Sequence, residues 1–394
     1  MFARLTPARK AIASLFGLFS LFAVAACDPV ALGTSPSGGP SVDTSAAVPV
    51  ALLVPRGSGN GGDDALAQSL ENAARLAIAD LGDVKIDLRV YSTAGNAAQA
   101  QNAAVQAVNE GAKIILGPVY AESANAVGVA VAPRGINVLS FSNNTTIAGG
   151  NVFVLGPTFQ NTANRLASFA ARQGKKRVLI VHSTDLAGQL GSRAIQNAVT
   201  NSGGTVAGVV GHELSQNGVV AAVPQIRNAA QSGQADAIFM TANTAGALPI
   251  LSQLLPEAGL TSANVQYIGL TRWDIPSSAP ALPGLQGGWF ALPDPNMSQR
   301  FDSRYSAAFG AAPHPIGGLA YDGIAAIGAL VKAGKSDALT ASALTQGAGF
   351  QGVNGIFRLN RNGVNERGLA VAQIRDQKVV VIDGAPRAFG GAGF

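Results

Sequence analysis

Short apolar segments alternate with helical segments along most of this chain, and that alternation restricts its fold more than any other feature. The expected strands are residues 48–54, 85–91, 113–116, 137–140, 177–181, 205–210, 237–240 and 265–269. The expected helices between them are residues 63–80, 97–109, 123–132, 161–173, 187–200, 219–231 and 245–255. Strands that are apolar throughout and separated by helices are typical of parallel sheets covered on both faces. The number of these units and the length of 394 residues allow two α/β domains.

The C-terminal part of the chain departs from this alternation. Further strands are expected at residues 289–292, 356–359, 369–374 and 379–382, and helices at 298–309 and 316–332. Asn-Gly at 362–363 and Asp-Gln at 376–377 stand where hairpin turns would join the last strands. We therefore expect an antiparallel extension of an existing sheet.

The N-terminus has the pattern of an export signal that ends at a cysteine. Basic residues within the first ten positions precede an apolar stretch at 11–23, and Ala25 and Ala26 stand before Cys27, the only cysteine of the chain. The apolar stretch is shorter than the roughly 20 residues that span a bilayer. We interpret residues 1–26 as a lipoprotein signal peptide and Cys27 as the lipidated residue. The alternative is an ordinary signal peptide with an incidental cysteine.

Residues 27–47 are rich in Gly, Ser, Pro and Thr and contain few large apolar side chains, which is typical of a flexible tether. The chain is thus expected in the periplasm, held by a lipid anchor. Asp28 directly after the cysteine favours the inner membrane under the enteric sorting rule, and the outer membrane stays open as the alternative.

The charge balance argues against a polyanionic partner. Of the 27 Lys and Arg residues, three lie in the signal, which leaves 24 basic against 22 acidic residues in the mature chain. No face with clustered Lys and Arg is evident, so we expect no nucleic-acid binding.

Catalysis, metal binding and cofactor binding find no support in the sequence. His182, His212 and His314 are widely spaced, and no His, Cys, Asp or Glu group has metal-ligand spacing. Residues 57–62 fit the GxGxxG pattern of dinucleotide sites, but Asp63 and Asp64 follow where a pyrophosphate would sit. We expect these two carboxylates to act as helix N-terminal caps. The chain is expected to be neither an enzyme nor a cofactor carrier.

Several segments together resemble the branched-chain-amino-acid-binding-protein family. They are residues 117–118 after the third strand, 138–140, 153–161 at a lobe crossing, and 320–322 in a late helix. The resemblance covers about residues 48–382. It implies a two-lobed type I periplasmic-binding-protein fold, with parallel sheets flanked by helices and an antiparallel C-terminal extension. The implied division is residues 48–157 with 287–334 in lobe 1 and residues 158–286 with 335–394 in lobe 2.

Within that family, residues 140–144, 269–274 and 321–323 look most like the lipoproteins that activate penicillin-binding proteins. This likeness implies a lipid-anchored activator that contacts a peptidoglycan-synthesising penicillin-binding protein. The alternative is the solute-binding receptor of an ABC importer for a small polar ligand.

The family's amino-acid site looks lost or rebuilt in this chain. The resemblance places Ala121 where the serine that faces the ligand carboxylate stands, and Thr271 where the acid that faces the ammonium stands, with Asp274 three residues on. Ala187 and Asn243 occupy the positions of the covering aromatic residues. A buried zwitterion needs both charges satisfied, so we expect free leucine, isoleucine or valine to bind weakly at most.

A set of polar residues is expected to line the cleft between the lobes and to contact a ligand or a partner. These residues are Tyr120, Ser142, Asn143, Asn144, Thr145, Asn243, Thr271, Arg272, Trp273 and Asp274. Arg272 and Trp273 are the expected centre of a contact with the synthase. Two alternatives stay open: residues 140–146 form a loop that satisfies its own backbone, and Arg272 and Asp274 form a structural ion pair packed under the indole.

Overall fold

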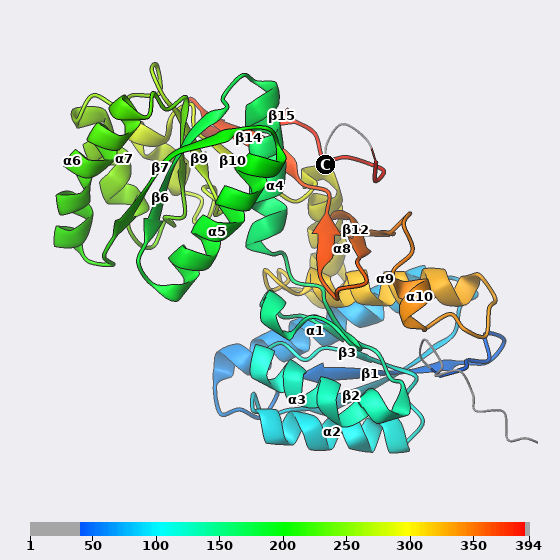
Figure 1. The fold of residues 1–394 in the computed structure, drawn as a ribbon. Helices are drawn as coiled ribbons and strands as arrows, with labels where there is room; N and C mark the ends of the chain where they lie inside the picture. Colours follow the sequence, from blue (N-terminus) through cyan, green and yellow to red (C-terminus); the bar gives the residue numbers. More distant parts are fainter. Residues whose placement is uncertain (1–39, 391–394) are drawn as a thin grey trace, which may run out of the picture. The chain divides into compact units, whose positions relative to one another are not determined.

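The computed structural model describes residues 40–390, which form two lobes, each built around its own sheet (Figure 1). The expected signal peptide at 1–26 and most of the expected tether, with Cys27, lie outside the described residues. Among the residues that are described, no helix is both long and apolar enough to cross a membrane.

The first lobe contains a parallel sheet with the strand order β2-β1-β3-β4-β5. Its strands are β1 (Val48–Val54), β2 (Ile86–Ser92), β3 (Ile114–Leu116), β4 (Val138–Ser140) and β5 (Val152–Val154). The central strand β1 is apolar along its length because both faces of the sheet are covered. Val50 and Leu52 pack on one face, and Ala51 and Leu53 pack on the other.

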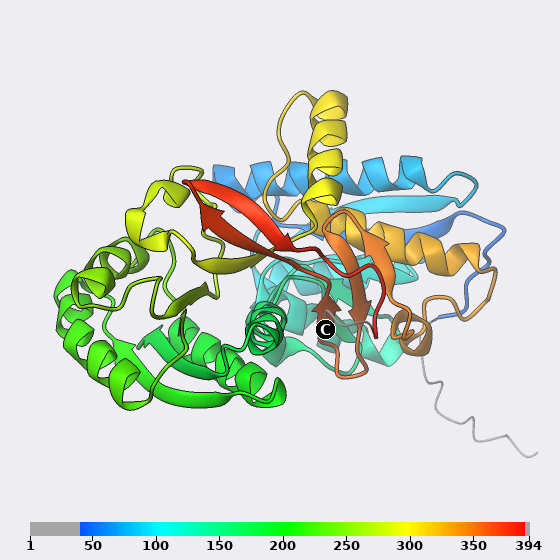
Figure 2. The ribbon, with the colours of Figure 1, turned by 90° about the horizontal axis from the view of Figure 1, so that it is seen from above.

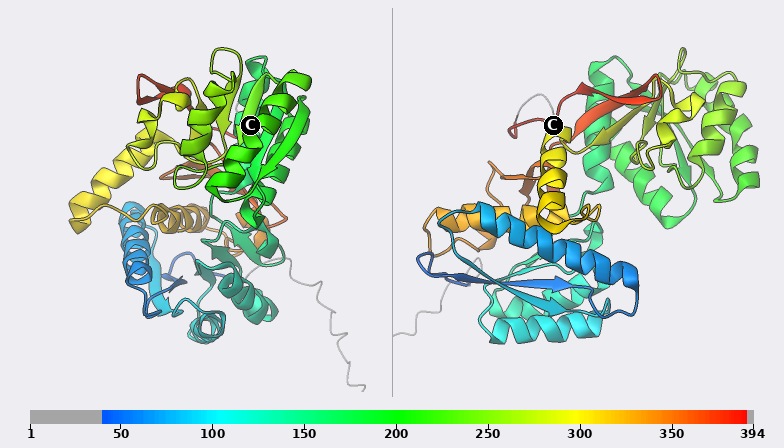
Figure 3. Two further views of the ribbon diagram at one scale, coloured as in Figure 1. Left: turned by 90° about the vertical axis from the view of Figure 1, so that its left-hand side faces the viewer. Right: turned by 180° about the vertical axis from the view of Figure 1, so that it is seen from behind.

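Helices on the two faces of the first sheet come from different parts of the chain. They are α1 (Gly61–Asp80), α2 (Ala97–Asn109), α3 (Ala121–Val131), α8 (Pro295–Phe309), α9 (Gly318–Lys332) and the short α10 (Ala341–Leu344). Helix α1 buries Leu66, Leu70, Ala73 and Ala77, which recur every three or four residues. That apolar face lies with α9 on one side of the sheet, while α2 and α3 cover the other side (Figure 3).

The second lobe contains a mixed sheet with the order β15-β14-β10-β9-β8-β6-β7. Its strands are β6 (Arg177–Ser183), β7 (Thr205–His212), β8 (Ala237–Met240), β9 (Gln266–Gly269), β10 (Trp289–Leu292), β14 (Ala370–Arg375) and β15 (Lys378–Asp383). Its helices are α4 (Phe159–Arg172), α5 (Leu186–Asn201), α6 (Gln216–Ser232) and α7 (Leu248–Glu257). Val178 and Ile180 of β6 pack with α4 and α5, and Leu179 and Val181 pack with α6 and α7.

The antiparallel C-terminal extension is confirmed. Strand β14 pairs antiparallel with β10, and β15 pairs antiparallel with β14, which lengthens the second sheet at one edge (Figure 2). A separate antiparallel sheet comprises β11 (Phe350–Gly352), β12 (Gly355–Leu359) and β13 (Asn365–Arg367).

Two groups of elements belong to the lobe opposite to the one expected. Residues 287–334 were expected in lobe 1, but β10 hydrogen-bonds with β9 and β14 in the second sheet. Residues 335–394 were expected in lobe 2, but α10 and β11 pack on α9, and side chains of β11 and β12 belong to the first-lobe core. Apolar patterning predicts that a segment is a strand without indicating which sheet it joins.

Buried polar side chains hold the segments that pass between the lobes. The Asn365 side chain donates to the carbonyl oxygens of Val154 (2.7 Å) and Gly156 (2.9 Å). The guanidinium group of Arg367 donates to the Leu155 carbonyl oxygen and forms a 2.9 Å ion pair with the buried Asp322. Burial raises the pKa of Asp322, although Arg367 acts in the opposite direction. Strand β13 is therefore fastened directly to residues 154–156, where the chain first passes between the lobes.

Candidate functional site

A hollow of about 630 Å³ lies at the carboxyl ends of β1, β2 and β3 in the first lobe. The chain turns toward β2 after β1 and toward β4 after β3, so the hollow lies where the strand order reverses. In open α/β sheets, ligands bind in the crevice at such a switch point. The lining residues are Ser58, Asn60, Asp63, Ala94, Gly95, Asn96, Ala97, Tyr120, Ala121, Glu122 and Ser123.

Asp63 and Tyr120 form the wall of this hollow between α1 and α3. The Tyr120 hydroxyl donates to Asp63 Oδ1 at 2.5 Å, and this bond to a carboxylate raises the pKa of the tyrosine. Asp63 is only 9% exposed, and its Oδ2 atom has no hydrogen-bond partner among the described residues. Its expected role as an N-cap is corrected, because Asn60 caps α1 by accepting from the Gly62 amide.

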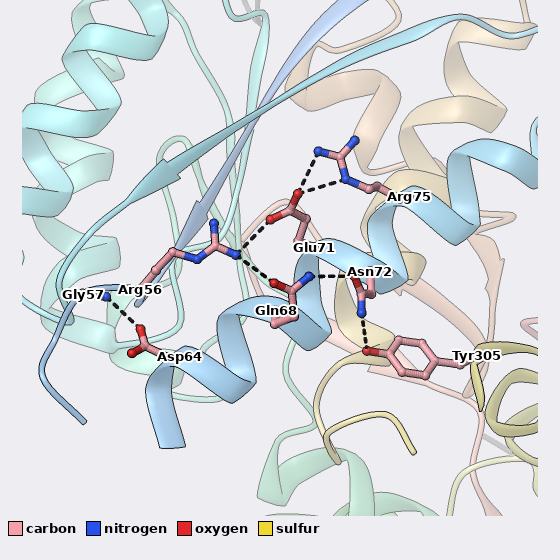
Figure 4. Close-up of polar contacts among 8 residues, drawn as sticks. All are labelled: Arg56, Gly57, Asp64, Gln68, Glu71, Asn72, Arg75 and Tyr305. Atoms are coloured by element: carbon pink, nitrogen blue, oxygen red, sulfur yellow. Dashed lines mark hydrogen bonds and ion pairs between the residues drawn. The ribbon is translucent and has the colours of Figure 1, made fainter. Parts of the chain in front are cut away.

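Arg56, the basic residue of the β1–α1 loop, does not line the hollow, and Figure 4 shows its guanidinium group directed toward Glu71 and Gln68 on α1. Arg56 donates to Glu71 Oε2 at 3.0 Å, and Glu71 also binds Arg75 at 2.7 Å on the same helix. Asp64, the neighbour of Asp63, accepts from the Gly57 amide at 2.9 Å and so folds the loop onto α1. These contacts hold the rim of the hollow in place.

The loop after β4 contains four of the expected cleft residues, Ser142, Asn143, Asn144 and Thr145. Its hydrogen bonds are mostly its own: the Ser142 hydroxyl accepts from the Asn144 amide, and Asn144 Oδ1 accepts from the amide and hydroxyl of Thr146. Ser142 and Asn144 therefore fit the alternative expectation, in which this loop forms hydrogen bonds with its own backbone. Asn143 and Thr145 are exposed and have side chains without a partner among the described residues.

A second cavity, of about 290 Å³, lies where the two lobes meet. Thr271 and Arg272 line it from the second lobe, while Asn354 and Arg367 line it from the first, among mostly apolar neighbours. Thr271 donates to the Ala242 carbonyl oxygen at 3.1 Å. Most polar groups here are already partnered, so the cavity is suited to the apolar part of a ligand.

Trp273 does not face a cleft, and the expectation that it forms a recognition surface is wrong. Its side chain is fully buried in the second-lobe core, with its ring against Gly269 and Gly288. Arg272 and Asp274 pair with each other through a 2.6 Å bond from Nε to Oδ1, as the structural alternative predicted. The indole is buried because glycines leave room for it beside β9 and β10.

Asn243 lies in the exposed loop after β8 and lines neither cavity. The structure thus brings only part of the expected set together: Tyr120 at the first-lobe hollow, and Thr271 and Arg272 at the junction cavity.

Sequence reasoning missed Asp63, Glu122 and Ser123 as lining residues. Ser123 is 1% exposed, and its hydroxyl has no hydrogen-bond partner among the described residues. The available signal was positional, because all three follow the ends of β1 and β3, where parallel strands present their loops to a ligand. Within residues 40–390, no group of three or more His, Cys, Asp or Glu side chains could hold a metal ion.

A family model for periplasmic binding proteins matches residues 47–378. A search of the curated proteins finds no match. Among solved structures, a provisionally assigned branched-chain amino acid ABC transporter from Rhodospirillum rubrum is similar with a TM-score of 0.71 and 19% identity, over 86% of this chain and 100% of that one.

Two other similar structures contain bound ligands. An ABC transporter substrate-binding protein from Desulfitobacterium hafniense in complex with Leu has a TM-score of 0.61 and 18% identity, over 86% of this chain and 100% of that one. A solute-binding protein of an ABC transporter from R. palustris in complex with benzoate has a TM-score of 0.55 and 18% identity, over 89% and 99%. At these identities the likeness shows the type I fold alone.

These findings correct the expectation of a penicillin-binding-protein activator. The family model and the similar structures belong to binding proteins, and those with ligands hold small solutes. The alternative of a solute-binding receptor agrees better with them than does a synthase partner.

Proposed function

Because the chain belongs to the periplasmic binding protein family, we propose that it is the solute-binding receptor of an ABC importer. Membership of this family implies a location in the periplasm. The proposed role is to hold a small polar solute and deliver it to a membrane permease. Binding is the whole of this role, and no catalytic step is assigned to any residue.

The observation that carries this proposal is the first-lobe hollow. It lies at the switch point of a parallel sheet and contains the unpartnered Ser123 hydroxyl and the unpartnered Oδ2 of Asp63. Buried polar groups are normally hydrogen-bonded, and those without a protein partner are suited to meet a ligand. The junction cavity beside Thr271 would take the rest of the solute.

We propose further that the mature protein is anchored by a lipid on Cys27. The pattern of a short apolar stretch, small residues and a lone cysteine supports this step. Cys27→Ser is expected to abolish incorporation of labelled palmitate and to stop processing at that site. Wild-type protein found free in the periplasm and cut at another position would contradict the anchor.

Solute binding is tested by calorimetry and thermal melting of the purified mature protein against a library of amines, amino acids, sugars and carboxylates. A ligand that binds only the folded state at a hundredfold its Kd stabilises that state by about 2.7 kcal/mol. We expect at least one compound to raise the melting temperature by an amount that grows with the logarithm of its concentration above Kd. A library without any such compound, together with unchanged solute uptake in a deletion strain, would contradict the proposal.

A further inference from the structure

The first-lobe hollow is acidic. Asp63 and Glu122 are the only charged side chains among its lining residues, and no Lys, Arg or His lines it. Glu122 is exposed and makes no ion pair among the described residues. Two negative charges therefore face one small space without a compensating cation.

The basic side chains of the two strand-end loops have carboxylate partners and do not line the hollow. Arg56 is bound to Glu71 at 3.0 Å and reaches Gln68 on the next turn of α1 (Figure 4). Across the lobe junction, Arg272 is paired with Asp274. Neither guanidinium lines the hollow, so neither offers a cation to a carboxylate bound there.

The helix N-termini at the hollow would by themselves favour an anion. Helices α1, α2 and α3 all begin at the hollow, and each N-terminus is equivalent to roughly half a positive charge, which favours anions. Asn60 and Asn96 cap the first two through their own side chains. Asp63 and Glu122 stand in the first turns of α1 and α3, so full negative charges already occupy the positions that a bound anion would take.

Independent evidence that something binds here comes from two largely buried polar side chains that line the hollow. Ser123 is 1% exposed and Asp63 is 9% exposed, and neither the Ser123 hydroxyl nor Asp63 Oδ2 has a hydrogen-bond partner among the described residues. Tyr120 already donates its hydroxyl proton to Asp63 Oδ1. The remaining need of Asp63 is for a donor, and a charged donor satisfies it most strongly.

We propose that this hollow binds the cationic end of the solute, an ammonium or guanidinium group, and excludes carboxylates. This proposal rests on the proposed function of solute binding. The proposed ligand preference differs from the ligands of two similar structures, because Leu and benzoate each carry a carboxylate. The ammonium or guanidinium group would donate to Asp63 Oδ2 and to the Ser123 oxygen, with Glu122 closing the site from outside.

The test uses the purified mature lipoprotein in detergent, titrated by calorimetry with putrescine, agmatine, glucose, benzoate and L-leucine. We expect putrescine or agmatine to bind, and Asp63→Asn and Glu122→Gln each to weaken that binding at least tenfold. Asp83→Asn is the matched control, because it removes one negative charge from an exposed first-lobe carboxylate that does not line the hollow. The control variant is expected to bind as the wild type does.

The possible outcomes separate this inference from the proposed function. If benzoate, leucine or glucose binds and neither amine does, the cation preference is wrong while solute binding stands. If an amine binds equally well to the wild type and to the Asp63→Asn and Glu122→Gln variants, the site lies elsewhere and the inference is also wrong. If none of the five probes binds, the inference fails, and solute binding is then judged by the wider library. Glu122 is exposed, so Glu122→Gln remains informative should Asp63→Asn fail to fold.

Discussion

The loops that follow β1 and β9 each contain an arginine paired with an acid, but the two pairs join different parts of the molecule. Arg56 and Glu71 are 38% and 14% exposed, and Arg272 and Asp274 are 37% and 17% exposed, so the two pairs are almost equally accessible. The first pair spans fifteen residues and joins a strand-end loop to α1. The second spans two residues and stays within one loop.

The two loops therefore depend on different forces. In the first lobe, charged side chains hold the loop against α1 and leave Asp63 open to the hollow. In the second lobe, the buried Trp273 holds the loop, and the ion pair of its two neighbours is partly exposed. Exposure alone does not show how much an ion pair contributes to the fold, because the elements that the pair connects matter as well.

Removing the indole should have the largest effect and would test whether Trp273 is the anchor of the second loop. Trp273→Ala leaves a cavity beside Gly269 and Gly288, and Trp→Ala changes in cores cost about 3–5 kcal/mol. Trp273→Phe is the matched control, since the indole Nε1 has no hydrogen-bond partner and no bond is lost with it. Urea unfolding should show a large loss of unfolding free energy for Trp273→Ala and a smaller loss for Trp273→Phe. Equal stability of Trp273→Ala and the wild type would place the anchor elsewhere.

Trp273 also shows what sequence patterns cannot predict. Its neighbours Arg272 and Asp274 suggest an exposed segment, and the glycines that make room for the ring are four and fifteen residues away. The ion pair was predicted, because its two members are separated by one residue. The bond between Asp63 and Tyr120 joins residues 57 positions apart, and only the order of the strands brings them together.

Strands show the same division between local and distant information. β1, β8 and β10 begin and end where their apolar runs predict, because each run alone is enough to define a buried strand. β5 (Val152–Val154) was missed, although β3 and β4 are equally short and were predicted. The sheet that β10 joins depends on its pairing with β9 and β14, which no local pattern contains.

An intermediate effect is expected from Glu71, and it should depend on pH. Burial alone would raise the pKa of this carboxyl, but the hydrogen bonds from Arg75 and Arg56 outweigh it and lower the pKa below the usual 4.5. A lowered pKa in the folded state contributes stability above pH 4.5, and that contribution is lost as the pH falls through the folded-state value. Glu71→Gln should therefore destabilise the protein by about 1 kcal/mol near neutral pH.

The measurement is the free energy of unfolding of both proteins at pH 7 and at successively lower pH. The difference between them should shrink as the pH falls below 4.5, because the Glu71 carboxylate is protonated first in the unfolded wild type, and it should be lost once the pH passes the folded-state pKa. A difference that stays constant over this range would mean that Glu71 acts through packing. Electrostatics would then not distinguish the first loop from the second.

The smallest effect is expected from Asp274→Asn, which removes the charge from the second pair. Arg272 is more than a third exposed, so solvent and salt screen the pair, and exposed pairs contribute about 0–1 kcal/mol. The loop should remain in place because Trp273 holds it from within. Urea unfolding at low and high salt should give nearly the same midpoint for the variant and the wild type. If Asp274→Asn instead costs as much as Glu71→Gln, then the pair within one loop stabilises as strongly as the pair that joins a loop to a helix. The contrast between the two lobes would then rest on Trp273 alone.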